Sequence, residues 1–596
     1  RWLTDLGIEH GGIDDRAVES GGLAGAKVAI LAYNPRPTQP EISALRSFVG
    51  RGGKLIVFGS CSGALARIMG LELGTYTVSD EPGRWAAMRF GTDPWKVPER
   101  IHETAWSLVP ARPSGEGTAV IARWENAEGR LTSDPACLVA PSGFWFCHLP
   151  RGDDPQGKRE LLLGLLAHHD PSLWPRAARH ALLRAGRIGS SPDIPSAFAH
   201  IRSRVPAAWK ARAEKQMDTV KALHWELATS FSERRYREVI QGSPRLAGEL
   251  ARAYSMTSVP KAGELRAVWD HDGVGLVPGD WALTSRRLAG AGITAIFPNL
   301  AWGGLAHYPS KVLPGSNTLR LHGDQLQQCV QAARAHGLET HVWKICWNLS
   351  NAPAEFRDRL RREGRLQRDR KGASQNWLCP SDPKNRALEL SVLKEMVSGY
   401  PIDGIHFDYI RYPSVDACFC PGCRSRFEAD RGAVVSAWPE DVQEGRPLYR
   451  RFLDWRAQQV TALVRDASRT LRPLRPGLEL SAAVFRSYPS CRESVGQDWK
   501  QWLDRGYLDF VCPMNYTESV ESFRATTRLQ RSVAGRADRL APGIGVLSGE
   551  SQLGPSETAA QVVAARELGA GGFVLFDLSP TLVDDVLPYL GFSAVE

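Results

Sequence analysis

The sequence Ile402-Asp403-Gly404-Ile405-His406-Phe407-Asp408-Tyr409-Ile410-Arg411-Tyr412-Pro413 changes character halfway along. Its first half is rich in isoleucine and phenylalanine, which favour buried strands. Its second half carries an acid, two tyrosines and an arginine. In a (β/α)8 barrel the chemistry lies at the C-terminal ends of the strands. The stretch therefore predicts a strand that ends in a functional edge, although Asp408 could equally cap a turn and pair with Arg411.

Seven further segments downstream of residue 262 share this strand-like, apolar character, and helical patterns separate all eight. In order the eight are Leu265–Trp269, Ile293–Pro298, Glu339–Ile345, Ile402–Asp408, Leu478–Phe485, Leu508–Met514, Ala541–Val546 and Gly572–Asp577. Eight such units in about 330 residues predict a (β/α)8 TIM barrel over 263–596. Long connections at 346–400 and 409–476 are typical of loops that build a substrate site.

Strand and helix patterns also alternate in residues 1–175, beginning with strands at Lys27–Asn34 and Lys54–Phe58. This alternation predicts an α/β domain with a flavodoxin-like, doubly wound sheet. Leu3–Gly7 reads as the end of a helix without its preceding strand, so we expect the domain to be truncated at its N-terminus. Residues 176–262 are mostly helical and predict a linker built around an αα-hairpin.

Gly59-Ser60-Cys61-Ser62-Gly63 lies between a predicted strand and helix, the setting of a nucleophile elbow. Class I glutamine amidotransferases place their cysteine in such a turn, and they also need a neighbouring His and Glu. His148 is the candidate histidine, and no glutamate follows it at the expected spacing. The domain is therefore interpreted as an amidotransferase-like scaffold or glycan-contacting module, with amidohydrolase chemistry at Cys61 as a less favoured alternative.

Composition narrows the function classes. The net charge of +9 comes from Lys and Arg interleaved with Asp and Glu over 596 residues, so nucleic-acid binding is not predicted. An anionic glycan remains an option as partner. No run of about 18 uncharged apolar residues predicts a membrane segment. The chain begins at Arg1 without a signal segment, which leaves a removed leader open.

Aromatic, acidic and amide side chains follow the predicted strand ends, where they would share one rim. They include Asp270, His271, Asp272, Trp302, His307, Tyr308, Trp343, Asp408, Tyr409, Arg411, Tyr412, Arg486, Asn515, Tyr516, Glu518 and Asp577. Sugar sites need this mixture of aromatic faces, polar groups and a carboxylate pair.

Four blocks resemble the bacterial glycosyl-hydrolase-like family 10: AHYPSK (306–311), GIHFDYIRYP (404–413), QDWKQW (497–502) and DFVCPMNY (509–516). The resemblance covers roughly residues 263–590 and implies a glycosidase-type barrel. Several family members are envelope proteins implicated in cleaving peptidoglycan glycan strands, which implies a cell-envelope or secreted location. By position, Asp408 matches the family's strand-4 aspartate, and Tyr308, Arg411, Tyr412, Asn515 and Tyr516 fall in matching motif positions.

We therefore expect a glycoside hydrolase acting on a polysaccharide or peptidoglycan-like glycan, with Asp408 as nucleophile or general acid/base. Asp272 and Glu518 are the preferred second carboxylates, and Asp270 and Asp577 compete with them. The expected substrate-binding residues are Trp302, His307, Tyr308, Trp343, Tyr409, Arg411, Tyr412, Arg486, Asn515, Tyr516 and Asp577. The alternative is a non-catalytic glycan-binding protein on the same barrel. Asp403 and Asp509, at strand starts, are expected to be structural.

Three of the eleven cysteines, Cys418, Cys420 and Cys423, form a C-x-C-x-x-C run after the fourth strand. Such a run can hold zinc if a fourth ligand arrives, and Cys379 is the candidate. A disulfide with a free thiol, or unpaired packing, are the alternatives. Either cross-link would be structural, and no cofactor is expected for catalysis.

Overall fold

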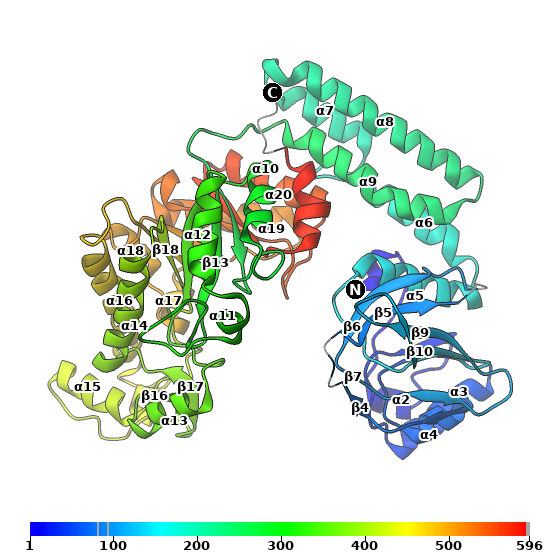
Figure 1. The fold of residues 1–596 in the computed structure, drawn as a ribbon, viewed down its shortest axis with the longest axis horizontal. Coiled ribbons are helices and arrows are strands. Elements are labelled where there is room, and N and C mark those ends of the chain that lie inside the picture. The colour runs from blue at the N-terminus through cyan, green and yellow to red at the C-terminus, as the bar shows by residue number, and fades with distance from the viewer. Residues whose placement is uncertain (80, 82, 92–94, 592–596) are drawn as a thin grey trace. The chain divides into compact units, whose positions relative to one another are not determined.

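The computed structural model describes residues 1–79, 81, 83–91 and 95–591 (Figure 1). The chain divides into two compact units, one of Arg1–Ala185 with His224–Pro244 and one of Gly186–Leu223 with Arg245–Glu596. Within the described ranges, none of the helices has both the length and the hydrophobicity that a membrane span needs.

The second unit contains a barrel of eight parallel strands. They are β12 (Leu265–Asp270), β13 (Ala295–Trp302), β15 (Glu339–Ile345), β18 (Gly404–Asp408), β19 (Glu479–Val484), β20 (Phe510–Pro513), β21 (Gly543–Gly545) and β22 (Gly572–Phe576). The ladder runs in chain order from β12 to β20, and β22 lies between β12 and β21. Bridges Val511–Leu540 and Met514–Gly543 join the remaining edges, so the barrel is nearly closed. The predicted barrel is confirmed.

Helices cover the outside of this barrel, several of them visible around β13 and β18 in Figure 1. They are α10 (Trp281–Gly290), α12 (Gln325–Ala335), α14 (Pro383–Gly399), α16 (Tyr449–Leu471), α18 (Trp499–Asp504), α19 (Val520–Ala534) and α20 (Pro555–Glu567). Side-chain caps explain where many of them begin. Asp280, Asp324 and Asp498, for example, each accept a backbone N–H from three residues downstream. Asp498 is therefore the N-cap of α18.

The two long connections carry secondary structure of their own. The connection after β15 contains α13 (Ala354–Arg362) and the hairpin of β16 (Leu366–Arg368) with β17 (Ser374–Leu378). The connection after β18 contains α15 (Pro421–Arg431). Figure 1 shows α13, β16, β17 and α15 grouped together. A shorter excursion after β13 holds β14 (Leu305–Ala306) and α11 (Asn317–His322).

Close packing around β18 explains its residues. A Cβ at Gly404 would lie 2.2 Å from Nδ1 of His341 on the neighbouring strand, so only glycine fits there. His406 is fully buried, and its Nε2 accepts the indole N–H of Trp269 at 2.9 Å. Burial holds the pKa of His406 well below its ordinary value, which keeps this interior ring neutral. The carboxylate of Asp403 accepts the Thr340 N–H at 2.8 Å, as expected of a structural residue at the strand start.

Asp509 has the same kind of role at the start of β20. Its Oδ2 accepts the N–H of Leu480 at 2.7 Å, and both of its oxygens lie 3.1 Å from Nη2 of Arg472. The two aspartates thus fasten neighbouring strands at the end of the barrel away from Asp408.

The first unit has a mixed seven-stranded sheet in the order β1-β2-β11-β10-β9-β5-β6. Its strands are β1 (Val28–Leu31), β2 (Lys54–Phe58), β5 (Trp85–Phe90), β6 (Arg100–Ala105), β9 (Ala119–Glu125), β10 (Leu131–Ala140) and β11 (Gly143–Phe146), with helices that include α3 (Gln39–Gly50), α4 (Gly63–Ile68) and α5 (Pro155–His169). Only β1, β2 and β11 are parallel. The other strands pair antiparallel, and short hairpin connections join β9 to β10 and β10 to β11. The sheet is therefore not doubly wound throughout, and the flavodoxin-like relation stays a prediction.

The predicted linker consists of α6 (Leu173–Ala185), α7 (Ile194–Arg204), α8 (Lys210–Ser232) and α9 (Tyr236–Ser255). From Arg245 onward, α9 belongs to the unit that contains the barrel. Leu246 and Leu250 are fully buried, and the Ser556 hydroxyl at the start of α20 donates to the Ala247 carbonyl at 3.2 Å. Part of the predicted linker is thus part of the barrel unit.

Candidate active site

Asp408 is the last residue of β18 and its side chain is nearly buried, with 6% of the residue exposed. Its Oδ1 accepts the N–H of Tyr409 at 2.6 Å. Burial raises the pKa of Asp408, while Arg411, the Tyr409 N–H, Trp343 and His271 favour its anion and oppose that rise. The pKa of Asp408 is therefore raised, but less than burial alone would raise it.

Arg411 lies within a cluster of aromatic rings. Its guanidinium carbon is 4.6 Å from the ring centre of Tyr409, 4.7 Å from that of Phe485 and 5.5 Å from that of Trp377. Nη1 donates to the Tyr412 carbonyl at 3.1 Å. The predicted turn-cap pairing with Asp408 is thus replaced by cation–π packing, and Arg411 acts on Asp408 through its charge.

Asp577 follows the last residue of β22. Burial raises its pKa to about 6, the charge of Asp272 acts in the same direction, and His271 opposes both. Its Oδ1 is buried and has no hydrogen-bond partner among the residues that the structure describes. A carboxyl oxygen in this state favours the protonated form.

His271 and Tyr516 connect these two carboxyls. The charges of Asp272, Asp577 and Asp408 all raise the pKa of His271, whose Nδ1 is 3.2 Å from Oδ1 of Asp272. Burial, then the charges of Asp408 and Asp577, raise the pKa of Tyr516. The ends of β12, β18, β20 and β22 therefore deliver one group of interacting side chains.

Aromatic rings surround His271. Its ring centre lies 4.7 Å from that of Trp302, 5.8 Å from that of Trp343 and 6.0 Å from that of Phe576. Phe576 also stacks on Tyr516 at 5.2 Å. The structure thus brings together several of the predicted site residues, namely Trp302, Trp343, Tyr409, Arg411, Tyr516 and Asp577.

Three predicted residues lie at the edge of this group. The side chain of Asp272 is 75% exposed, and its hydrogen bond to His271 lowers its pKa. His307 is mostly buried beside Ser316, at 2.8 Å between Nδ1 and Oγ, and burial lowers its pKa to about 4. Arg486 is half exposed and donates to the Tyr516 carbonyl at 3.2 Å.

Three other predicted binding residues point away from the rim. The Tyr308 hydroxyl donates to Oε2 of Glu395 on α14 at 3.2 Å. Tyr412 is fully buried with Arg456 stacked on its ring at 4.3 Å. These two side chains are structural, because each faces the layer of helices.

Asn515 is the third predicted binding residue whose side chain points away from the rim. Its Nδ2 donates to Oε1 of Gln530 at 2.7 Å, and the Gln530 amide donates back to Oδ1 at 2.7 Å. Both polar ends of Asn515 are thereby occupied by α19, so the side chain cannot also bind a sugar.

Two of the competing acids also differ from expectation. Glu518 is exposed in the loop before α19. The charges that shift the pKa of Asp408 are those of Arg411 and His271, and Glu518 is not among them. Asp270 is buried and accepts the N–H groups of Gly273 at 3.1 Å and Gly275 at 2.9 Å, so it holds the loop that carries His271. Neither geometry supports a direct catalytic role.

Sequence reasoning assigned no role to several residues that belong to the site. They are Trp377, Phe485 and Phe576. His271 was expected on the rim, between two aspartates at a strand end, but without a specific role. No sequence signal pointed to Trp377, because β17 belongs to a hairpin with β16 that is far in sequence from the end of any barrel strand.

The predicted alternative chemistry at Cys61 needs a histidine within reach of its sulfur. Cys61 is exposed, and across the described ranges its sulfur makes no hydrogen bond to a histidine. Nε2 of His148 instead lies 3.4 Å from Oε1 of Glu103, which also pairs with Lys158 at 2.7 Å. The geometry therefore does not support a cysteine–histidine pair there.

Comparison with known proteins shows that the barrel is similar to glycosyl-hydrolase-like proteins. Residues 280–555 match the sequence model of the family described as Glycosyl hydrolase-like 10. The chain is 24% identical over 265 residues to Glycosyl hydrolase DigH of Escherichia coli (strain K12), a match that covers 38% of this chain and 55% of DigH. It is 22% identical over 238 residues to Glycosyl hydrolase YngK of Bacillus subtilis (strain 168), covering 35% of this chain and 43% of YngK.

Among solved structures, the PgaB (BpsB) glycoside hydrolase domain from Bordetella bronchiseptica is similar with a TM-score of 0.45 and 13% identity, covering 52% of this chain and 94% of that domain.

Proposed function

We propose that the barrel hydrolyses glycosidic bonds of a bacterial polysaccharide or peptidoglycan-like glycan, with Asp408 and Asp577 as its carboxylate pair. The observation that carries this proposal is geometric: Asp408 ends β18, Asp577 follows Phe576 at the end of β22, and the ring of Phe576 lies 6.0 Å from that of His271 and 5.2 Å from that of Tyr516. In keeping with this placement, the charges of both carboxyls raise the pKa of His271 and of Tyr516. The two carboxyls come from β18 and β22, which stand four strands apart in the barrel order. A pair of carboxyls on either side of a cleft is the arrangement that glycosidic hydrolysis requires.

The two carboxyls have environments that suit different roles. Asp577, with a pKa of about 6 and an oxygen without a described partner, is the general acid that protonates the leaving oxygen. Asp408 is assigned as the ionised partner: burial raises its pKa, and Arg411, the Tyr409 N–H and His271 oppose that rise by favouring the anion. It acts either as nucleophile or as the base that activates water. Asp272 orients and charges His271 through their 3.2 Å contact.

The rings around this pair suit the binding of sugars. Trp302, Trp343 and Tyr516 lie around His271 and Phe576, and their faces can pack against sugar rings. Trp377 and Tyr409 extend this aromatic surface beyond Asp408, 5.4 Å apart between ring centres. A glycan of several sugar units fits such an extended surface better than a single sugar. A peptidoglycan-like substrate would place the protein in the cell envelope or outside the cell.

The test is the release of reducing ends from purified glycan strands and a panel of bacterial polysaccharides. Asp408→Asn and Asp577→Asn are each expected to lower the rate by at least about 100-fold. Glu518→Gln changes an exposed acid in the loop before α19; it is the matched control and should retain activity. Loss of activity in Glu518→Gln with full activity in Asp577→Asn would refute the assignment. Binding of glycan by the wild type without any cleavage would favour the non-catalytic alternative.

A further inference from the structure

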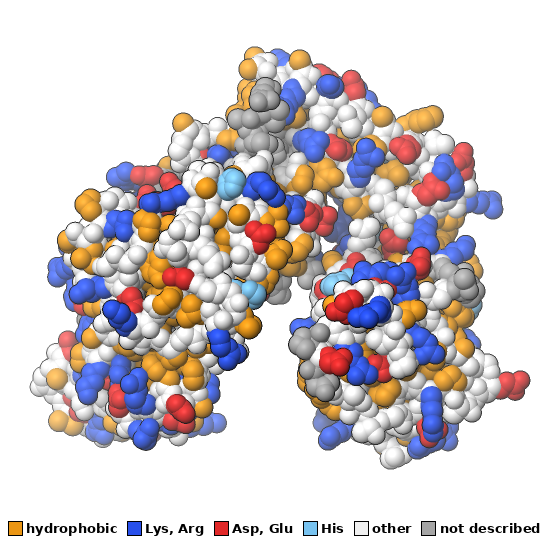
Figure 2. Space-filling view, in the orientation of Figure 1, with side chains coloured by type: hydrophobic (Ala, Val, Ile, Leu, Met, Phe, Trp, Pro, Cys, Tyr) orange, Lys and Arg blue, Asp and Glu red, His pale blue; other side chains and the backbone are white. Residues whose placement is uncertain are grey.

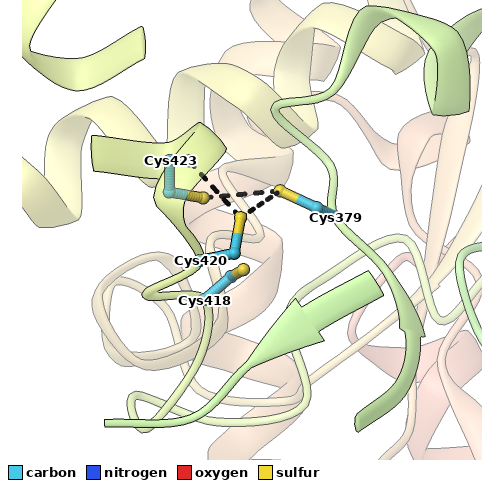
Figure 3. A group of neighbouring side chains, drawn as sticks. All are labelled: Cys379, Cys418, Cys420 and Cys423. Atoms are coloured by element: carbon cyan, nitrogen blue, oxygen red, sulfur yellow. Dashed lines mark hydrogen bonds between the residues drawn. The ribbon is translucent and has the colours of Figure 1, made fainter. Parts of the chain in front are cut away.

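Four cysteines gather beside the candidate active site. The Sγ atoms of Cys379, Cys418, Cys420 and Cys423 all lie within 4.8 Å of one another, and Figure 3 shows them pointing toward one another. Each residue is at most 2% exposed. Sγ of Cys379 is 3.4 Å from that of Cys423 and 3.8 Å from that of Cys420. Sulfurs around a tetrahedral zinc, with Zn–S bonds of about 2.3 Å, stand about 3.8 Å apart.

The turn Cys420-Pro421-Gly422-Cys423 presents its sulfurs to a common point. The backbone N–H of Cys423 donates to Sγ of Cys420 at 3.4 Å, and α15 begins at Pro421 directly after Cys420. Backbone donors and a helix N-terminus both stabilise a thiolate over a thiol. Thiolates are the form in which cysteine binds a metal.

Two arginines near the cluster, Arg456 and Arg426, would be stabilised by a negative charge there. Arg456 is 1% exposed, its Nε has no hydrogen-bond partner among the described residues, and its guanidinium lies 4.3 Å from the ring centre of Tyr412. Its Nη2 donates to the Ser414 carbonyl at 2.7 Å. Arg426 donates to Ser381 Oγ at 3.0 Å and approaches Sγ of Cys379 at 3.9 Å. Buried cations require nearby anions, and a zinc ion with four thiolates carries two negative charges.

We propose that Cys379, Cys418, Cys420 and Cys423 bind one zinc ion that fastens the connection after β15 to the connection after β18. Four protein ligands leave no open position on the metal, so the site is structural. Cys379 stands two residues after Trp377, whose ring lies 5.4 Å from Tyr409 and 5.5 Å from the Arg411 guanidinium. The zinc thereby holds Trp377 against the segment that follows Asp408.

The experiment measures the metal content of the purified full chain by elemental analysis. We expect one zinc per chain in the wild type, and loss of more than nine-tenths of it in Cys379→Ser and in Cys423→Ser. Cys512→Ser is the matched control, since Cys512 is a free cysteine buried in the barrel and outside the cluster. It should keep the full zinc content. Chelation should lower the Tm of the wild type and of Cys512→Ser.

A second measurement covers the case in which the cluster variants do not fold. Wild-type protein freed of zinc and titrated with Co²⁺ should show the visible bands of tetrahedral cobalt thiolate, and added Zn²⁺ should abolish them. Wild-type protein that contains no zinc and gives no such bands would overturn the proposal. So would a disulfide between two of the four cysteines, found by mass spectrometry of the alkylated, unreduced chain. Neither readout depends on glycan cleavage, so the zinc site stands or fails apart from the proposed hydrolase activity.

Discussion

At the scale of single residues, the proton on Asp577 links stability to pH. Its pKa is about 6 in the folded chain against 3.8 as its ordinary value, so the folded state retains a proton that the unfolded state loses. The stabilisation from this proton is complete below about pH 4 and is lost as the pH rises through about 6. Asp577→Asn should therefore raise the free energy of unfolding at pH 7 by on the order of 1–2 kcal/mol after allowance for solvent screening, and with it the Tm, and should leave both unchanged at pH 4.

Thermal unfolding at the two pH values measures this effect, and Asp272→Asn provides a control of opposite sign. The hydrogen bond from His271 lowers the pKa of Asp272, so its contribution is present at neutral pH and is lost as the pH falls through the folded-state value. Asp272→Asn should lower the Tm at pH 7. An equal shift for Asp577→Asn at both pH values would contradict the assigned pKa.

His271 sets the upper limit of the active pH range. Its charge lowers the pKa of Asp577 and of Asp408, so removing it should raise both values. Because the general acid must be protonated, kcat/KM of the wild type should fall above about pH 6, and His271→Gln should move that fall to higher pH. The profile of kcat/KM against pH on a cleaved glycan measures it. A shift to lower pH in His271→Gln would exclude Asp577 as the acid.

At the scale of elements, the amide pair of Asn515 and Gln530 joins the end of β20 to α19. The two amides exchange hydrogen bonds of 2.7 Å in both directions, and Gln530 also donates to the Arg486 carbonyl at 2.8 Å. Asn515→Ala leaves Oε1 of the buried Gln530 without the Asn515 donor, and the Gln530 amide keeps only its bond to the Arg486 carbonyl, so the variant should lose about 1–3 kcal/mol of unfolding free energy. Denaturant unfolding measures the loss. If the variant keeps its stability and binds glycan much more weakly, Asn515 is a binding residue and not a structural one.

The direction of individual side chains explains what the sequence could and could not predict. The eight barrel strands were predictable, because each is a short apolar run and parallel strands place their ends on one rim. The buried position of the Tyr412 side chain was not predictable, because Tyr409 adopts a left-handed backbone conformation (φ 51°) that redirects the chain after the strand. Burial raises the pKa of Asp577, and the charge of His271, which comes from the other end of the barrel sequence, opposes that rise. No local pattern encodes that meeting.

The two long connections, after β15 and after β18, show the same limit at the level of elements. Long connections predicted loops that build a site, and both long connections do contribute to it. Their hairpin and helix could not be placed, because Trp377 reaches Arg411 only through the packing of β17 beside the segment after β18. The cysteine spacing was the one local sign that these connections meet.

At the scale of the whole molecule, the position of the domain boundary can be tested. The sequence pattern starts the barrel at residue 263, whereas the compact unit includes Gly186–Leu223 and Arg245 onward. Leu246, Leu250 and Tyr254 of α9 are at most 2% exposed. Arg252 Nη2 donates to the Pro588 carbonyl at 3.2 Å, so α9 also holds the C-terminal segment.

A fragment of residues 263–596 should therefore be less stable than a fragment of 186–596. Each large apolar side chain removed from the interface takes away about 1.5–3 kcal/mol of burial and leaves its partners exposed to water. Calorimetric unfolding should give a lower Tm for the shorter fragment, with stronger binding of a dye that detects apolar surface. The longer fragment should cleave the same glycan as the full chain, because every residue of the proposed site lies within it. Equal Tm values for the two fragments would show that α9 is a linker after all, and that the barrel is complete without it.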